Sequence, residues 1–145
     1  MAKIKKTIMI AAPVEQVFDC IGTPENMPVV WPSLLEVRDV EQQPDGLYRY
    51  NWTYKMAGMR FDGHSEDLEV VPNQRIVNRN RGGIDATITW TLRSQDDGTE
   101  LTYEVEYNIP IPVLGKLAEA IVVRMNENET DVLLSNIKDR VEAQA

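Results

Sequence analysis

The chain has 145 residues, of which 43% are hydrophobic and 26% are charged, the balance of an ordinary globular protein. This length can bury one core but leaves no room for a second, so we expect a single ligand-binding domain over residues 1–145. The formal net charge of -8 repels a phosphate backbone and excludes nucleic acid as an expected partner.

The residue types that build disulfides and metal sites are scarce. A single cysteine, Cys20, excludes an internal disulfide, and with a single histidine, His64, it cannot supply a Cys/His zinc site. No phosphate-binding loop or nucleophile elbow is present. No apolar run approaches the roughly 20 residues of a membrane span, and Pro13 ends the short apolar start too early for a signal peptide. We therefore expect a cytoplasmic protein without metal or cofactor.

The N-terminal part predicts a strand followed by short helical segments. Apolar residues at even positions indicate a strand over residues 3–10. Residues 14–21 then carry apolar side chains at helical spacing, and a glycine and a proline end this helix. Three prolines within residues 23–33 permit only a loop or a broken helical turn, which Trp31 would anchor to the core.

Six strand-like runs follow at regular intervals. Each is bounded by a pair of residues typical of hairpin turns, such as Asp45-Gly46 or Gly82-Gly83. Because the links between the runs are short, an antiparallel meander is favoured over parallel strands. The runs cover residues 35–41, 46–56, 60–71, 74–81, 84–93 and 99–109.

Three of these strands alternate cleanly between an apolar and a polar face. This period of two predicts a sheet with one dry face and one solvated face. The apolar positions are Tyr48, Tyr50, Trp52, Tyr54 and Met56; Ile84, Ala86, Ile88, Trp90 and Leu92; and Leu101, Tyr103, Val105, Tyr107 and Ile109.

The C-terminal part predicts one long helix. From residue 113 to about residue 142 there is no proline and a single glycine, which indicates roughly 30 helical residues, on the order of 45 Å. Asn126, Asn128 and Glu129 interrupt the apolar pattern, which we interpret as solvation of the helix beyond the sheet. The predicted buried stripe is Leu114, Leu117, Ala118, Ile121, Val122, Met125 and Val132, continued on a rotated face by Leu133, Ile137 and Val141.

Together these elements predict an α+β fold in which a curved antiparallel sheet wraps around one helix. A helix about 10 Å across can seal the hollow of a coiled sheet but cannot fill it, so we expect an apolar pocket between the two. The alternative is that the aromatic residues simply fill the core. The predicted ligand-binding residues are Trp31, Trp52, Tyr54, Met56, Arg79, Trp90, Tyr103, Tyr107, Leu117, Ile121 and Met125.

One end of the sheet carries the features of a pocket mouth. In a meander, alternate turns share one end, which brings Ala57-Gly58, Gly82-Gly83 and the entry to the long helix together. Residues 56–59 are apolar where a hairpin tip is normally polar, and residues 109–114 are apolar as well. We expect the mouth here, and transient contact with a membrane or a partner protein would use the same surface.

Arg79 is the predicted polar contact of the ligand. If Pro72-Asn73 and Gly82-Gly83 are both two-residue turns, the odd positions of the strand between them face inward, and Arg79 is among them. Its guanidinium would then pair with a carboxylate or enolate oxygen of the ligand.

His64 is the weaker candidate for catalysis. It titrates near neutral pH without help, and Glu66 on the same strand face would orient it as a general base. Both face inward only if Gly63 forms a bulge. The alternative is a histidine that is exposed to solvent or hydrogen-bonded among polar strand residues.

Four segments resemble a known family across nearly the whole chain. They are PVEQVFD at residues 13–19, MPVVWPSL at 27–34, DGTEL at 97–101 and IPIPVLG at 109–115. They resemble the START-like helix-grip superfamily, on its polyketide cyclase/dehydrase and lipid-transport branch. The resemblance implies a strand, two short helices, six strands and a long helix around a ligand cavity. It also implies a function among cyclases, aromatases, lipid or sterol carriers and quinone-binding proteins.

The leading hypothesis is therefore the binding of a hydrophobic small molecule such as a lipid, a quinone or a polyketide. The first alternative is a cyclase or dehydratase that acts on a polyketide-like substrate through His64, Glu66 or Arg79. The second is an interaction module whose apolar mouth docks a protein or a membrane surface.

Overall fold

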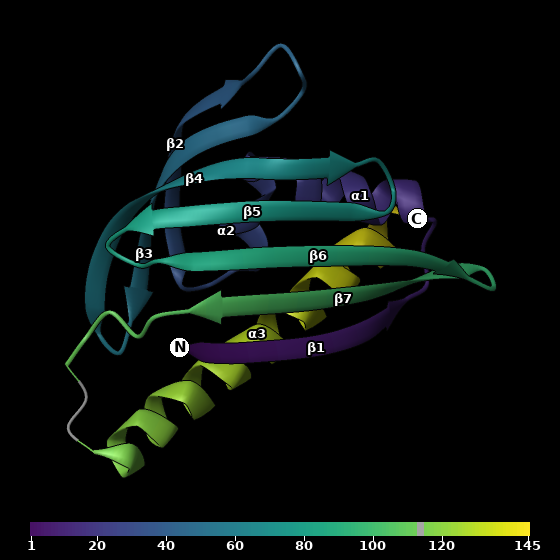
Figure 1. Cartoon of the computed structure of the whole chain (residues 1–145). Helices are drawn as coiled ribbons and strands as arrows, with labels where there is room; N and C mark the ends of the chain where they lie inside the picture. Colours follow the sequence, from purple (N-terminus) through teal and green to yellow (C-terminus); the bar gives the residue numbers. More distant parts are fainter. Residues whose placement is uncertain (113–114) are drawn as a thin grey trace.

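The computed structural model describes residues 1–112 and 115–145, and in this part of the chain one antiparallel sheet covers one long helix (Figure 1). The seven strands lie in the order β1-β7-β6-β5-β4-β3-β2, so that β2 to β7 form a meander and β1 joins it beside β7. The elements are β1 (Ala2–Ile10), α1 (Val14–Gly22), the 3-10 turn η1 (Pro24–Asn26), α2 (Met27–Val30), β2 (Leu34–Gln42), β3 (Tyr48–Met56), β4 (Met59–Val71), β5 (Arg75–Gly82), β6 (Ala86–Gln95), β7 (Gly98–Tyr107) and α3 (Lys116–Gln144).

The pairing of the strands confirms the predicted dry face. Trp90 on β6 lies opposite Tyr103 on β7, and Ile8 on β1 lies opposite Leu101. Because successive side chains of a strand point to opposite faces, these pairs stack on the concave side of the sheet. The threonines of β6 and the glutamates of β7 alternate to the convex side. The predicted α+β fold, with short helices after the first strand, is confirmed.

The long helix is buried only over its second half. Leu133, Leu134, Ile137 and Val141 are at most 3% exposed, and α3 packs there against β1, α1 and α2. The 29 residues of α3 extend about 44 Å, whereas a ten-residue strand such as β7 covers about 33 Å. The helix therefore projects past the edge of β1, as Figure 1 shows at the lower left.

Because the helix projects past the sheet, the prediction that its first apolar stripe is buried is wrong. Leu117 is 78% exposed, Ile121 56% and Met125 48%, so these side chains do not meet the dry face of the sheet. The prediction that they line the pocket is wrong, because helical periodicity identifies an apolar face but not how much of it a shorter sheet can cover. Leu114, also part of that stripe, lies outside the described residues. No helix in residues 1–112 and 115–145 is both long enough and apolar enough to cross a membrane.

The register of β4 and β5 differs from the prediction. Val71 pairs with Arg75, so the turn between them holds three residues rather than two, with Asn73 at a φ of 64°. The register also shifts between Asp67 and Glu69, where a bulge leaves Leu68 without a partner. Each added residue exchanges the two faces of a strand, and on β5 the even positions are therefore the buried ones.

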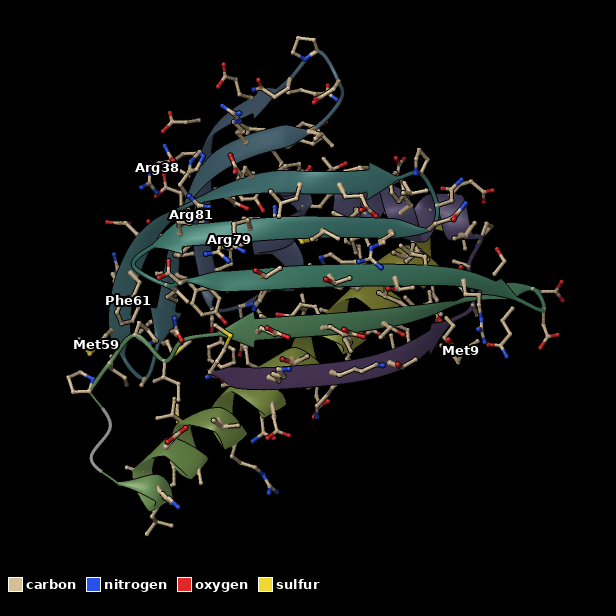
Figure 2. The ribbon with its side chains drawn as sticks, viewed as in Figure 1. Met9, Arg38, Met59, Phe61, Arg79 and Arg81 are labelled. Atoms are coloured by element: carbon tan, nitrogen blue, oxygen red, sulfur yellow. The ribbon has the colours of Figure 1, made fainter. Side chains whose placement is uncertain are left out.

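Because the inner and outer faces of β5 are exchanged relative to the prediction, Arg79 lies on the convex side of the sheet. Figure 2 shows Arg79 and Arg81 on the face turned away from α3. The Arg79 guanidinium donates a hydrogen bond to the Thr87 hydroxyl, at 3.2 Å, on the same outer face. The prediction that Arg79 points into the pocket is wrong, because it assumed a two-residue turn after β4.

Gly63 does not form the predicted bulge, but its lack of a side chain is required. A Cβ at this position would lie 2.1 Å from Cζ2 of Trp52, which pairs with Gly63 across β3 and β4. The glycine thus lets the indole lie flat on β4 and keeps Trp52 on the concave face.

Candidate ligand-binding cavity

A cavity of about 320 Å³ lies under the concave face of the sheet. Its walls come from the inner faces of β3 to β7, from α1 and the segment around α2, and from the middle of α3. Seven of the predicted ligand-binding residues line it, and their contact with a ligand stays a prediction. They are Trp31, Trp52, Tyr54, Met56, Trp90, Tyr103 and Tyr107.

Aromatic rings in edge-to-face contact build one wall of the cavity. Trp31 meets Tyr54 with ring centroids 5.8 Å apart and Tyr103 at 6.0 Å, and Tyr103 meets Trp90 at 4.9 Å. Such pairs contribute about 0.5–1.5 kcal/mol each beyond the area they bury. Trp31 therefore anchors the proline-rich segment after α2 to the sheet, as the sequence predicted.

Polar residues of α3 close the cavity at the Met56 end. The amide of Asn126 donates to the Tyr107 hydroxyl at 2.6 Å and also lies 3.8 Å from the sulfur of Met56. One turn further on, a carboxylate oxygen of Glu129 accepts the Ser33 backbone N–H at 2.8 Å. The interpretation as solvated helix positions is wrong for Asn126 and Glu129, since both join α3 to the rest of the fold, whereas Asn128 is exposed.

The exposed residues of the lining mark an opening at a different end from the predicted mouth. Asp19 lies near the end of α1, and Gln42 and Gly46 belong to the hairpin between β2 and β3, at the top of Figure 1. At the β3–β4 end, Met56 is only 7% exposed. Of the segments expected at the mouth, residues 56–59 and 109–115, Met56 is the one described residue that lines the cavity, while Val113 and Leu114 lie outside the described part.

The wall formed by β4 and β5 carries a chain of hydrogen bonds. Asn78 is its centre: its side-chain oxygen accepts hydrogen bonds from Ser65, at 2.7 Å, and from the Asn80 amide, at 3.0 Å. The Asn78 amide in turn donates to Asp67 at 3.0 Å. The second oxygen of Asp67 accepts the backbone N–H of Tyr48 at 3.0 Å. Asp67, Asn78 and Asn80 all line the cavity, which gives it one polar wall among apolar ones.

Burial changes the titration of the groups in the cavity. It raises the pKa of Tyr50 to about 12, although the neighbouring Ser65 hydroxyl counteracts part of the rise. Burial also raises the pKa values of Tyr54 and Tyr103, so these phenols stay neutral at physiological pH. It raises the pKa of Asp67 too, against the opposing hydrogen bonds from Tyr48 and Asn78.

His64 and Glu66 lie on the convex face, away from the cavity. The Nδ1 atom of His64 is 2.9 Å from the Asn51 side-chain oxygen, and the histidine is exposed to solvent. Glu66 lies 3.8 Å from the Arg49 guanidinium on the neighbouring strand. The prediction of an inward-facing His64–Glu66 pair is wrong, because the bulge that shifts the register lies at Leu68 rather than at Gly63.

Sequence reasoning missed Asp67, Asn78 and Asn80 as cavity residues. The spacing of the two asparagines, two positions apart on one strand, was a usable signal for a shared face. It was ambiguous, because β5 carries arginines at the alternate positions and so has polar residues on both faces. Within residues 1–112 and 115–145, no group of three or more His, Cys, Asp or Glu side chains is arranged to hold a metal ion.

Comparisons with known proteins agree on the fold. The sequence matches, over residues 1–142, the family described as polyketide cyclase/dehydrase and lipid transport. No curated protein matches it significantly.

Three solved structures illustrate the structural similarity. The Thermus thermophilus protein TTHA0849 is 20% identical, with a TM-score of 0.86 and 99% of each chain covered. A START superfamily protein from Mycobacterium smegmatis is 17% identical, with a TM-score of 0.81 and 99% of each chain covered. The Zhui aromatase/cyclase from a Streptomyces species is 16% identical, with a TM-score of 0.72, and 99% of this chain matches 98% of that one. At these identities the likeness establishes the helix-grip fold alone.

Proposed function

This chain belongs to the polyketide cyclase/dehydrase and lipid-transport family, and on that premise we propose that it binds a hydrophobic small molecule in the cavity under its sheet. The members of such a family share a scaffold but differ in chemistry, so the proposal depends on the site itself.

The observation that supports the proposal is the cavity of about 320 Å³ among large buried side chains. Protein interiors are packed nearly as densely as organic crystals, and voids larger than a water molecule are few. A volume of this size lies at the lower end of small-molecule pockets, which range over about 300–1,000 Å³. The arrangement of aromatic residues such as Trp52, Trp90 and Tyr103 around this space supports the proposal over the alternative that they are core filler.

The test uses the fluorescent probe N-phenyl-1-naphthylamine, which is apolar and emits strongly when it leaves water. We expect saturable enhancement with the wild-type protein. Ala86→Phe places a ring on the cavity wall and is expected to abolish the enhancement. Thr87→Phe, the next residue along the same strand but on the convex face, is the matched control and should leave binding intact. Binding that is absent in the wild type, or equal in the two variants, would contradict the proposal.

A second candidate function is a cyclase or dehydratase that acts on a polyketide-like substrate. It is favoured by Asp67, a carboxyl group with a raised pKa in the cavity wall, close enough to influence the pKa of Tyr50. Carboxyl groups perturbed in this way serve as general acids or bases. The test is to incubate a linear poly-β-ketone thioester with the protein and follow cyclised product by mass spectrometry. Wild-type protein should accelerate its formation and Asp67→Asn should not, whereas equal rates would exclude Asp67 as the catalytic group.

A further inference from the structure

The charges in the cavity wall are unevenly distributed. Among the described residues that line the cavity there is no lysine, arginine or histidine, and Val113 and Leu114, outside the described part, carry no charge. Two lining residues are acidic: Asp19, which is exposed, and Asp67, which is partly exposed and accepts the Tyr48 N–H beside the β2–β3 hairpin. The arginines of β5 that could have balanced Asp67 alternate to the convex face. The described lining of the cavity therefore contains two carboxyl groups, of which Asp67 is the less exposed, and no balancing cation.

The chain of hydrogen bonds in the polar wall leaves unused hydrogen-bond acceptors at its two ends. Both lone pairs of the Asn78 side-chain oxygen are used by Ser65 and Asn80. The side-chain oxygen of Asn80 takes part in none of these bonds, although Asn80 is only 8% exposed. At the other end, each oxygen of Asp67 accepts one hydrogen bond and retains a further lone pair. Both ends of the chain of hydrogen bonds thus retain unused acceptors on residues that line the cavity.

A ligand with a negative charge is disfavoured at this wall. The free amide N–H groups of Asn78 and Asn80 are the donors that an anion would seek, but Asn78 already lies 3.0 Å from a carboxylate oxygen of Asp67. An anion bound there would lose its hydration and also lie within a few ångströms of a like charge. A hydroxyl or amino group is favoured at the same wall, because it can donate hydrogen bonds to the free acceptors of Asp67 and Asn80.

We propose that the cavity takes a hydrophobic molecule whose polar end is a hydrogen-bond donor without negative charge, an alcohol, a phenol or an amine, seated against Asp67 and Asn80. This inference rests on the proposed binding function and names the class of ligand for the same cavity. The aromatic walls fit such a ligand, since Trp and Tyr faces attract both apolar bodies and ammonium groups. The carboxylate of a fatty acid seated against Asp67 would, by contrast, lie beside a like charge.

The test is displacement of N-phenyl-1-naphthylamine by three competitors with one hydrophobic body: decanol, decylamine and decanoate. Wild-type protein should release the probe to decanol and decylamine at concentrations at least about tenfold lower than to decanoate. Because an ionised head group weakens entry into any apolar pocket, the decisive quantity is how this order changes when Asp67 loses its charge.

Three variants separate the role of Asp67 from general hydrophobicity. Asp67→Asn should lower the preference for decylamine over decanol and reduce the discrimination against decanoate, each by about tenfold. Glu66→Gln removes the same charge from the neighbouring position on the convex face and should change neither ratio. Asn80→Asp adds a second carboxyl group to the cavity and should move both ratios in the opposite direction, which keeps the test informative if Asp67→Asn unfolds.

The possible outcomes distinguish two kinds of failure. If no competitor and no probe binds the wild-type protein, the proposed binding function is wrong and this inference is wrong with it. If the probe binds but the three head groups compete alike, or if Asp67→Asn and Asn80→Asp leave the order unchanged, binding stands and the assignment of the ligand class is overturned.

Discussion

The two faces of the β4–β5 pair are equally polar in sequence but behave differently in the fold. On the concave side, Asp67 and Asn78 are joined by short hydrogen bonds and take part in the cavity wall. On the convex side, Glu66 and Arg79 lie opposite each other with their side chains partly exposed, and Glu66 has its closest basic partner in Arg49, at 3.8 Å. Exposed ion pairs of this kind contribute about 0–1 kcal/mol, whereas a buried polar group that loses its partner costs about 1–3 kcal/mol. Substitution of these polar residues is therefore expected to lower stability more on the concave face than on the convex face.

The largest expected effect is at the glycine that supports the concave face. Gly63→Ala places a Cβ against the Trp52 ring and should lower the free energy of unfolding by about 3 kcal/mol or more. Gly58→Ala is the control, because its Cβ would meet no atom within 4 Å and only the positive φ of 80° is strained, at a cost of about 1 kcal/mol. Urea unfolding measures both. Equal losses would show that the indole can move away from β4 without cost.

The next effect concerns the centre of the hydrogen-bond chain. Asn78→Ala leaves Ser65, Asn80 and Asp67 without a shared partner and should lower the free energy of unfolding by about 2–3 kcal/mol. Arg79→Ala, the next residue on the convex face, should cost no more than about 1 kcal/mol, since it removes a single partly exposed hydrogen bond to Thr87. Thermal unfolding of the two variants decides the comparison. A larger loss for Arg79→Ala would contradict it.

A smaller effect is expected in the dependence of stability on pH. Because burial raises the pKa of Asp67 in the folded state, the native protein holds this proton more tightly than the unfolded chain. The contribution to stability is therefore present at low pH and is lost as pH rises from the ordinary aspartate pKa through the raised one. Asp67→Asn should show less of this loss in urea unfolding between about pH 4 and pH 7.

Glu142 is expected to change the dependence of stability on pH in the opposite direction. Hydrogen bonds from Lys138 and from the Ala11 N–H lower the pKa of this exposed carboxyl. Its contribution is present above the ordinary glutamate pKa and is lost as pH falls through the lowered one. Glu142→Gln should therefore reduce the loss of stability on acidification and leave the behaviour near neutral pH unchanged. If the free energy of unfolding depends on pH in the same way in Asp67→Asn and Glu142→Gln, the opposite pKa shifts of the two carboxyl groups would be contradicted.

The smallest effect is expected at His64, the weaker candidate that the sequence offered for catalysis. His64→Ala removes an exposed imidazole on the convex face and should change stability by no more than about 0.5 kcal/mol. Probe binding in the cavity should remain at the wild-type level. A loss of binding in this variant, with the fold intact by circular dichroism, would show that the two faces are coupled through the sheet.

The sequence by itself determined the strands, the meander of β2 to β7 and the dry face of β3, β6 and β7. In these strands large apolar residues alternate with threonine, glutamate or lysine, so only one register buries them, and hairpin pairs mark the turns between them. For the same reason six of the predicted ligand-binding residues, Trp52 and Tyr103 among them, lie around the cavity, and Trp31, from the segment after α2, joins them there. The family segments added the helix-grip arrangement.

Only the tertiary structure decided the chemistry of the cavity. On β5, asparagines and arginines alternate, so both faces are polar and the pattern does not say which one is buried; a third residue in the turn at Asn73 and the bulge at Leu68 make that choice. The apolar stripe of α3 likewise predicts a buried helix face, but the sheet is shorter than the helix and leaves Leu117 and Ile121 outside. Periodicity is a local property of the chain, whereas register and overlap depend on how distant elements meet, and this is why Asp67 rather than Arg79 lies in the cavity.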